Sequence, residues 1–64
     1  GNAAAVRRVA AAWIAAVGGQ TLLPGQVYAV GEVYLVNVLD SAPPHDLRHQ
    51  IAIHAADGRV VVLN

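Results

Sequence analysis

Only one segment of the sequence has the periodicity of a helix, and every later apolar segment reads as a β-strand. Residues 3–17 contain eight alanines, the residue with the highest helix propensity. Apolar side chains recur there at helical spacing and predict a stripe that faces the core, made of Val6, Val9, Trp13 and Val17 with Ala10 and Ile14 beside them. The opposite side carries alanines, which are either simply exposed or allow a close contact with another element.

The ends of this helix have their own signals. Asn2 is a suitable N-cap because its side-chain oxygen can accept from an early backbone N–H. Gly18 and Gly19 mark the C-terminal end, since glycine adopts the left-handed conformation at little cost. The arginines at 7 and 8 before the apolar run also resemble a signal peptide. We favour a structural helix, because cleavage after the glycines would leave about 45 residues without one.

The rest of the chain predicts strands separated by turns. Pro24-Gly25 predicts a turn, and valine, tyrosine and leucine then favour strands over residues 26–30 and 32–40. Gly31-Glu32 is either a tight turn between these strands or a bulge in one long strand. Residues 41–46, with two prolines, predict a loop, and residues 47–55 alternate as a half-buried strand does. Asp57-Gly58 predicts a hairpin turn into a last strand over residues 59–63.

These elements predict a single α+β domain over residues 1–64. Its one N-terminal helix packs on a three- or four-stranded antiparallel sheet. Short connections predict that residues 32–40 pair with residues 47–55, which pair with residues 59–63.

One helix covers one face of such a sheet, yet the segment 32–40 is apolar on both faces. Hydrophobic residues make up 56% of the chain and charged residues 12%, well below the usual quarter. With no cysteine, the chain has no disulfide to stabilise so small a core. We therefore expect a homodimer or higher homo-oligomer that covers the second face. The last strand is an edge strand and offers another route to self-association, since Val60, Val61 and Val62 carry no charge to block pairing with another chain.

Composition and motifs argue against several functions. Four scattered arginines form no basic surface for nucleic acid, and no apolar run is long enough to span a membrane. The three histidines lack the spacing of a metal site, so we expect no metal and no cofactor. The carboxylates lie near turns, and Ser41 and Thr21 lack the surroundings of a nucleophile. These features predict a protein that is not an enzyme.

The residues that we expect to contact a partner lie on the strands. Tyrosine is enriched at interfaces because it combines a large rigid area with a polar tip, although it is also a common strand residue. The candidates are Tyr28, Tyr34, Val36 and Val38.

Three stretches carry a resemblance to a known family: AAVRRVAAAWIAAVGG, GEVYLVNVLD and HQIAIHAADGRVVVL. Their order of helix, glycine pair, strands and acidic-glycine hairpin resembles the PepSY domains, which occur in protease propeptides and cell-envelope proteins. This resemblance implies a modulator or inhibitor of peptidases. The last two stretches are also similar to the end of small immunity proteins with a nuclear-transport-factor-like fold. Residues 26–31 are similar to the cystatin Gln-x-Val-x-Gly loop.

All three resemblances imply protein binding without catalysis. The sequence thus predicts a non-catalytic protein-binding module, which the PepSY resemblance makes a protease-modulating or inhibitory domain. The alternatives are a self-assembling structural domain, a small-ligand-binding domain and a small enzyme.

Overall fold

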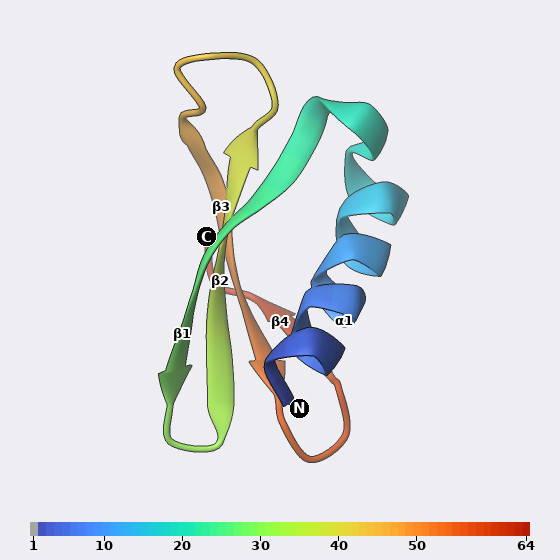
Figure 1. Cartoon of the computed structure of the whole chain (residues 1–64), viewed down its shortest axis with the longest axis vertical. Helices are drawn as coiled ribbons and strands as arrows, with labels where there is room; N and C mark the ends of the chain where they lie inside the picture. The colour runs from blue at the N-terminus through green and yellow to red at the C-terminus, as the bar shows by residue number, and fades with distance from the viewer. Residues whose placement is uncertain (1) are drawn as a thin grey trace.

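The computed structural model describes residues 2–64 and has one α-helix packed against a four-stranded antiparallel sheet (Figure 1). The helix α1 spans Asn2–Val17, and a short 3-10 turn, η1, spans Gly19–Thr21. The strands are β1 (Leu22–Val30), β2 (Val33–Asp40), β3 (Leu47–His54) and β4 (Val60–Val62). The sheet order β1-β2-β3-β4 follows the chain. The predicted α+β layout is therefore confirmed, with four strands. The side chain of Asn2, the predicted N-cap, lies outside the described residues.

The core lies between α1 and one face of the sheet. Val6, Ala10 and Ile14 are buried at four-residue intervals on the helix. They meet a buried layer from β2 and β3 made of Val36, Val38, Ile51 and Ile53. Val9 and Trp13 pack at the sides of this line. Val17, predicted to continue the core stripe, is the last residue of α1 and is 54% exposed instead.

The β1–β2 connection is a two-residue turn. Val30 pairs with Val33, and Gly31 between them has φ +58°, which only glycine adopts readily. This turn confirms the first of the two readings of Gly31-Glu32 and excludes a single long strand.

The prediction that Pro24-Gly25 forms a turn is wrong, because both residues lie inside β1. Pro24 pairs with Val38 and Val27 with Val36, so Gly25 and Gln26 together oppose one residue of β2 in a β-bulge. An edge strand tolerates the missing N–H of proline on its solvent side. The leucine at 39 fills the space over Gly25, where a Cβ would lie 3.0 Å from its Cδ1.

The β3–β4 hairpin is longer than a two-residue turn, since β3 ends at His54 and β4 begins at Val60. The N–H of Gly58 donates to the carbonyl oxygen of His54 at 2.8 Å, and Gly58 has φ +73°. The carboxylate of Asp57 accepts from the N–H of Arg59 at 3.0 Å. The predicted turn at Asp57-Gly58 is therefore confirmed, although both flanking strands are shorter than expected.

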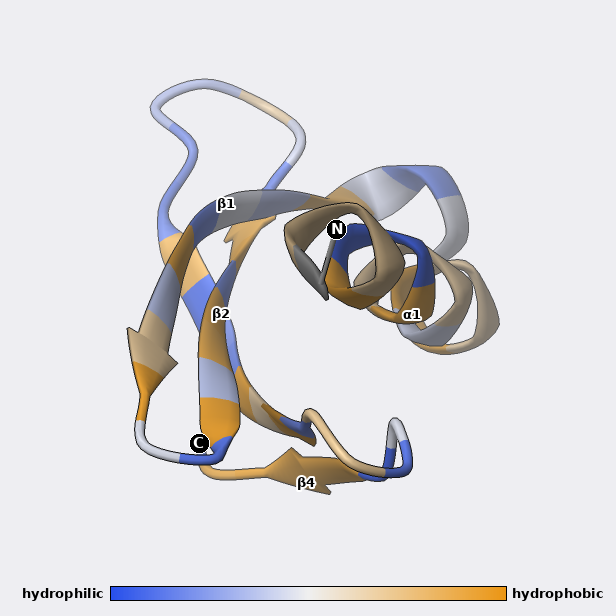
Figure 2. Cartoon of the chain, turned by 60° about the horizontal axis from the view of Figure 1, so that its bottom comes forward, coloured by the Kyte–Doolittle hydropathy of each residue, from blue (hydrophilic) through white to orange (hydrophobic). Residues whose placement is uncertain are grey.

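The sheet curls around α1, so that the helix lies on its concave side (Figure 2). None of the helices that the structure describes has the length and apolar character needed to cross a membrane.

Candidate functional site

The face of the sheet that points away from α1, called here the open face, is the main candidate for a functional surface. Strand register defines it. Leu35 pairs with Tyr28 on one side and with Ala52 on the other, and Ala52 pairs with Val61. The neighbouring row aligns Val30, Val33 and His54. With the remaining rows, the open face consists of Leu23, Tyr28, Val30, Val33, Leu35, Asn37, Leu39, Leu47, Gln50, Ala52, His54, Arg59, Val61 and Leu63.

Two amide side chains lie at the middle of this largely apolar surface. Asn37 and Gln50 are directly opposite each other in the β2–β3 ladder. The Nε2 of Gln50 donates to the Oδ1 of Asn37 at 3.1 Å. This single bond leaves the Oε1 of Gln50 as an acceptor and the amide group of Asn37 as a donor. The pair therefore offers a donor and an acceptor side by side to anything that covers the face.

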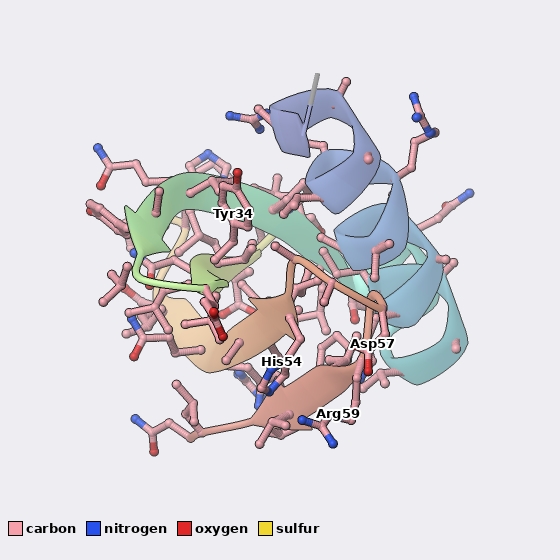
Figure 3. The ribbon with its side chains drawn as sticks, turned by 90° about the horizontal axis from the view of Figure 1, so that it is seen from below. Tyr34, His54, Asp57 and Arg59 are labelled. Carbon is pink, nitrogen blue, oxygen red and sulfur yellow. The ribbon has the colours of Figure 1, made fainter. Side chains whose placement is uncertain are left out.

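Positive charge on the open face is confined to one corner. A terminal nitrogen of the Arg59 guanidinium lies 3.3 Å from Nε2 of His54, and Figure 3 shows the two side chains next to each other at the β4 side. Among the described residues that form the face, none is a carboxylate. Glu32 lies nearby, in the β1–β2 turn. The centre of the face is therefore uncharged, as the core of a protein interface usually is.

The four residues predicted to contact a partner separate onto the two faces. Tyr28 lies on the open face, is 44% exposed, and its hydroxyl donates to Oε1 of Gln26. Val36 and Val38 have no exposed area, because α1 covers them, so a partner of the folded chain cannot touch them. Their prediction as contact residues is corrected here: alternation identified two apolar faces but not which one the helix covers. Tyr34 also points to the helix side and is half-buried.

Strict alternation along β3 would place Leu47 on the same face as Ile51 and Ile53, but the structure places it on the open face. Val38 pairs with His49 while Leu39 pairs with Leu47, so Arg48 is an extra residue between the two pairs. This bulge places Leu47 beside Leu39, where it is 55% exposed. Arg48 lies 3.6 Å from the carboxylate of Asp40 in an ion pair on the surface.

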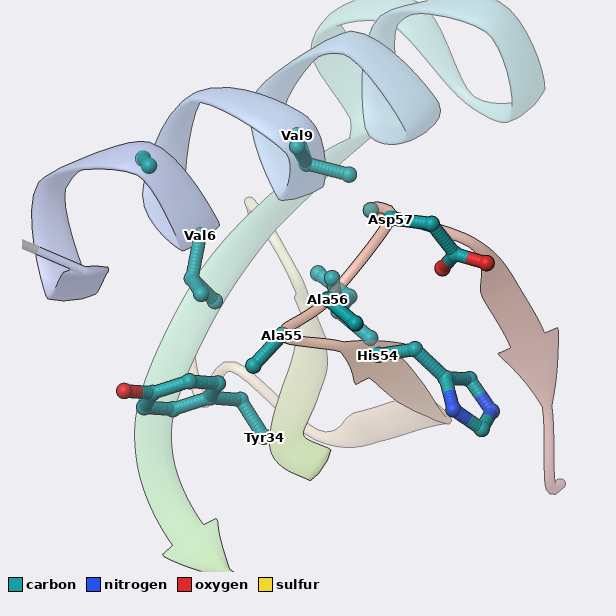
Figure 4. Close-up of a pocket in the computed structure, with 10 residues that line it drawn as sticks. Val6, Val9, Tyr34, His54, Ala55, Ala56 and Asp57 are labelled. Atoms are coloured by element: carbon teal, nitrogen blue, oxygen red, sulfur yellow. The ribbon is translucent and has the colours of Figure 1, made fainter. Parts of the chain in front are cut away.

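A second candidate site is a pocket of about 300 Å³ between the first half of α1 and the β3–β4 loop. Its walls are the side chains of Val6 and Val9 from the helix, Tyr34 from β2, and Ala55 and Ala56 from the loop. Figure 4 shows that the hydroxyl of Tyr34, the imidazole of His54 and the carboxylate of Asp57 all point away from the enclosed space. The pocket is therefore lined mainly by apolar groups and lacks converging polar groups of the kind that hold a reacting substrate.

The three histidines have separate structural surroundings. His49 packs against Trp13, and its Nδ1 lies 3.1 Å from the backbone oxygen of Asn64. His45 is in the 41–46 loop with φ +62°, and its Nδ1 lies 3.0 Å from the backbone oxygen of Asp40. His54 contacts Arg59 on the open face. No cluster of three or more metal-ligating side chains occurs in the described part of the chain.

Sequence reasoning did not identify the pair of Asn37 and Gln50. The available signal was the alternation of β2, which places Asn37 in line with Leu35 and Leu39. Its partner could be found only by aligning β2 with β3, and the bulge at Arg48 shifts that register by one residue.

Comparison with known proteins returned no match: no family model matches the chain, nor does any curated protein or any solved structure.

Proposed function

We propose that this chain is a non-catalytic protein-binding module that binds its partner on the open face. The observation that carries the proposal is the largely apolar side of β1, β2 and β3 opposite α1, on which Tyr28, Val30 and Leu47 are exposed. Contiguous apolar surface of this kind marks interaction sites on small soluble domains.

The chemistry of the face supports a protein rather than a charged ligand as its partner. Its centre combines branched aliphatic side chains with one amide pair, and its flank carries the exposed ring of Tyr28. Interface cores are depleted of charge and enriched in tyrosine. A nucleic acid or other polyanion needs several cations in register, whereas this surface has Arg59 at one corner.

The PepSY-like order of elements supports a narrower proposal, in which the partner is a peptidase or its precursor. In that case the purified chain lowers the turnover of its cognate peptidase. Leu35→Asp on the open face relieves the inhibition, and Ala11→Asp on the outer side of α1 leaves it intact.

Photo-crosslinking tests the general proposal and identifies the partner at the same time. A benzophenone-bearing phenylalanine analogue replaces Tyr28 in one variant and Ala11, which is exposed on α1, in a matched control. In an extract of the native source, the Tyr28 position should crosslink to protein and the Ala11 position should not. Adding Leu35→Asp should abolish the crosslink. Equal labelling from both positions, or none from Tyr28, contradicts the proposal.

The apolar pocket favours a second candidate function, the binding of a small uncharged apolar molecule. Its volume is at the lower end of the range for ligand sites. Benzene is a suitable probe: it should shift the NMR signals of Val6 and Val9 in the wild type. The variant Ala56→Phe, designed to fill the space, should prevent the shift. Unchanged signals in the wild type exclude this function.

A further inference from the structure

We infer that the occupant of the open face is a second copy of the same chain, packed sheet to sheet about a two-fold axis. This inference rests on the proposed function, because it names the partner of the same surface. It specifies an axis that runs along the strands, between β2 and β3. Such an axis places β2 of one copy over β3 of the other, and β1 over β4.

The amide pair is self-complementary in this arrangement. Asn37 of one copy faces Gln50 of the second copy, and Gln50 faces Asn37 in return. The free amide group of Asn37 can then donate to the free Oε1 of Gln50 across the interface, twice over. A two-fold interface requires this reciprocity, in which the same two surface groups meet in both directions.

The apolar side chains of the two open faces are also complementary in this arrangement. Leu35 of one copy faces Ala52 of the second copy, so a large side chain meets a small one in both directions. In the same row, Tyr28 on the β1 flank faces Val61 on the β4 flank. Nearer the loop, Leu39 faces Leu47, whose side chain is more than half exposed in the single chain.

Charge complementarity favours this axis as well. Arg59 lies at the β4 corner of the face, in line with His54, Val33 and Val30. The axis therefore brings Arg59 to the β1–β2 turn of the second copy, which carries Glu32. A two-fold axis perpendicular to the strands would instead place each strand over the same strand of the second copy, so that Asn37 would face Asn37. The formal net charge of the chain is zero, so two copies do not repel each other at long range.

The available area allows only a weak dimer. β1, β2 and β3 have eight or nine residues each and β4 has three, so the open face offers at most roughly 450 Å² on each copy. Because the sheet curls around α1, this face is convex (Figure 2), and contact is closest over β2 and β3. The two copies together then bury at most roughly 900 Å², the size range of weak, transient interfaces. We therefore expect a dimer that forms at about 100 μM and dissociates on dilution.

Sedimentation equilibrium tests this inference. The wild type at about 1 mM, roughly ten times the expected dissociation constant, should approach twice the 6.6 kDa mass of one chain, and the average mass should fall on dilution. Leu35→Asp should be a monomer, and Ala11→Asp, on the outer side of α1, should remain a dimer. Tyr28→Asp is a second face variant, at a more exposed position, should Leu35→Asp fail to fold. Circular dichroism establishes that each variant is folded.

A charge-pair experiment tests the axis itself. Asn37→Asp and Gln50→Lys should each weaken self-association. Mixed together, the two variants should form a heterodimer about 10-fold tighter than either homodimer. A folded wild-type monomer at that concentration overturns the inference, as does a dimer that survives Leu35→Asp, which is the result expected of pairing through the β4 edges. If the wild type is monomeric but the Tyr28 position still crosslinks to another protein, the second copy is excluded and the proposed function stands. If the wild type is monomeric and the Tyr28 position crosslinks to no protein, the inference and the proposed function are both wrong.

Discussion

Trp13 and His49 contact each other edge to face, with ring centroids 5.7 Å apart and ring planes at 83°. The contact joins the second half of α1 to β3. Because a backbone oxygen can only accept, the Nδ1 of His49 donates to the backbone oxygen of Asn64 at 3.1 Å. One imidazole thus connects the helix, a central strand and the segment after β4.

The first prediction concerns this contact. Trp13→Ala should lower the free energy of unfolding by about 2 kcal/mol, less than for a fully buried tryptophan, because Trp13 is half-buried. His49→Ala should also destabilise the fold. In a double-mutant cycle followed by circular dichroism, the two changes should couple by about 0.5–1.5 kcal/mol. Strict additivity would show that the ring contact contributes nothing to stability.

A second prediction follows from the close approach of Gly18 and Leu22. A Cβ at Gly18 would lie 2.3 Å from Cδ1 of Leu22, so the leucine side chain must move to admit it. Because Leu22 packs against the core, Gly18→Ala should cost about 1–3 kcal/mol of stability. In a Leu22→Ala background the same change should cost almost nothing. Urea denaturation of the wild type, the two single variants and the double variant measures these stability costs. An equal cost of Gly18→Ala in both backgrounds would contradict the predicted clash.

The third prediction concerns the left-handed backbone of Gly58. At φ +73°, Gly58→Ala should lower stability by about 1 kcal/mol, because an L side chain disfavours this conformation. Gly58→Asn is the matched variant and should cost less, since asparagine tolerates the left-handed region better. Thermal denaturation compares them. If the Gly58→Ala variant is as stable as the wild type, the left-handed backbone at this position does not require glycine and the prediction is wrong.

A fourth prediction compares two aliphatic residues of β3. Ile51 is completely buried under α1, so Ile51→Ala should cost about 2–5 kcal/mol. Leu47 is more than half exposed on the open face, and Leu47→Ala should change the stability of the monomer by about 0.5 kcal/mol or less. Urea denaturation at low protein concentration measures both. Similar costs for the two changes would show that the face assignment is wrong.

The architecture was predictable from the sequence because its signals are local. Alanine content and helical spacing predicted α1, and alternation with turn residues predicted the strands. Gly31 and Gly58 marked two reversals correctly, since each has the positive φ that makes glycine favourable. The pairing of neighbouring strands followed from the short connections between them.

The details that failed depend on contacts between distant segments. Pro24-Gly25 reads as a turn locally, yet pairing with β2 holds it in an edge strand with a bulge. The bulge at Arg48, which depends on pairing with β2, moves Leu47 to the other face. Nothing local to β2 says which of its two apolar faces the helix covers, so alternation alone cannot assign Val36 and Val38 to the core rather than to a partner.

The central claim is that α1 covers one face of the sheet and that a second protein chain covers the other. Side-chain NMR with a soluble paramagnetic probe tests it most directly, by comparing the methyl groups of Leu35 with those of Ile51 across a dilution series. We predict that the Ile51 methyl groups stay protected at every concentration, while the Leu35 methyl groups are protected in concentrated samples and become accessible on dilution. Leu35 methyl groups that respond equally to the probe at all concentrations would contradict the claim that a second copy covers the open face.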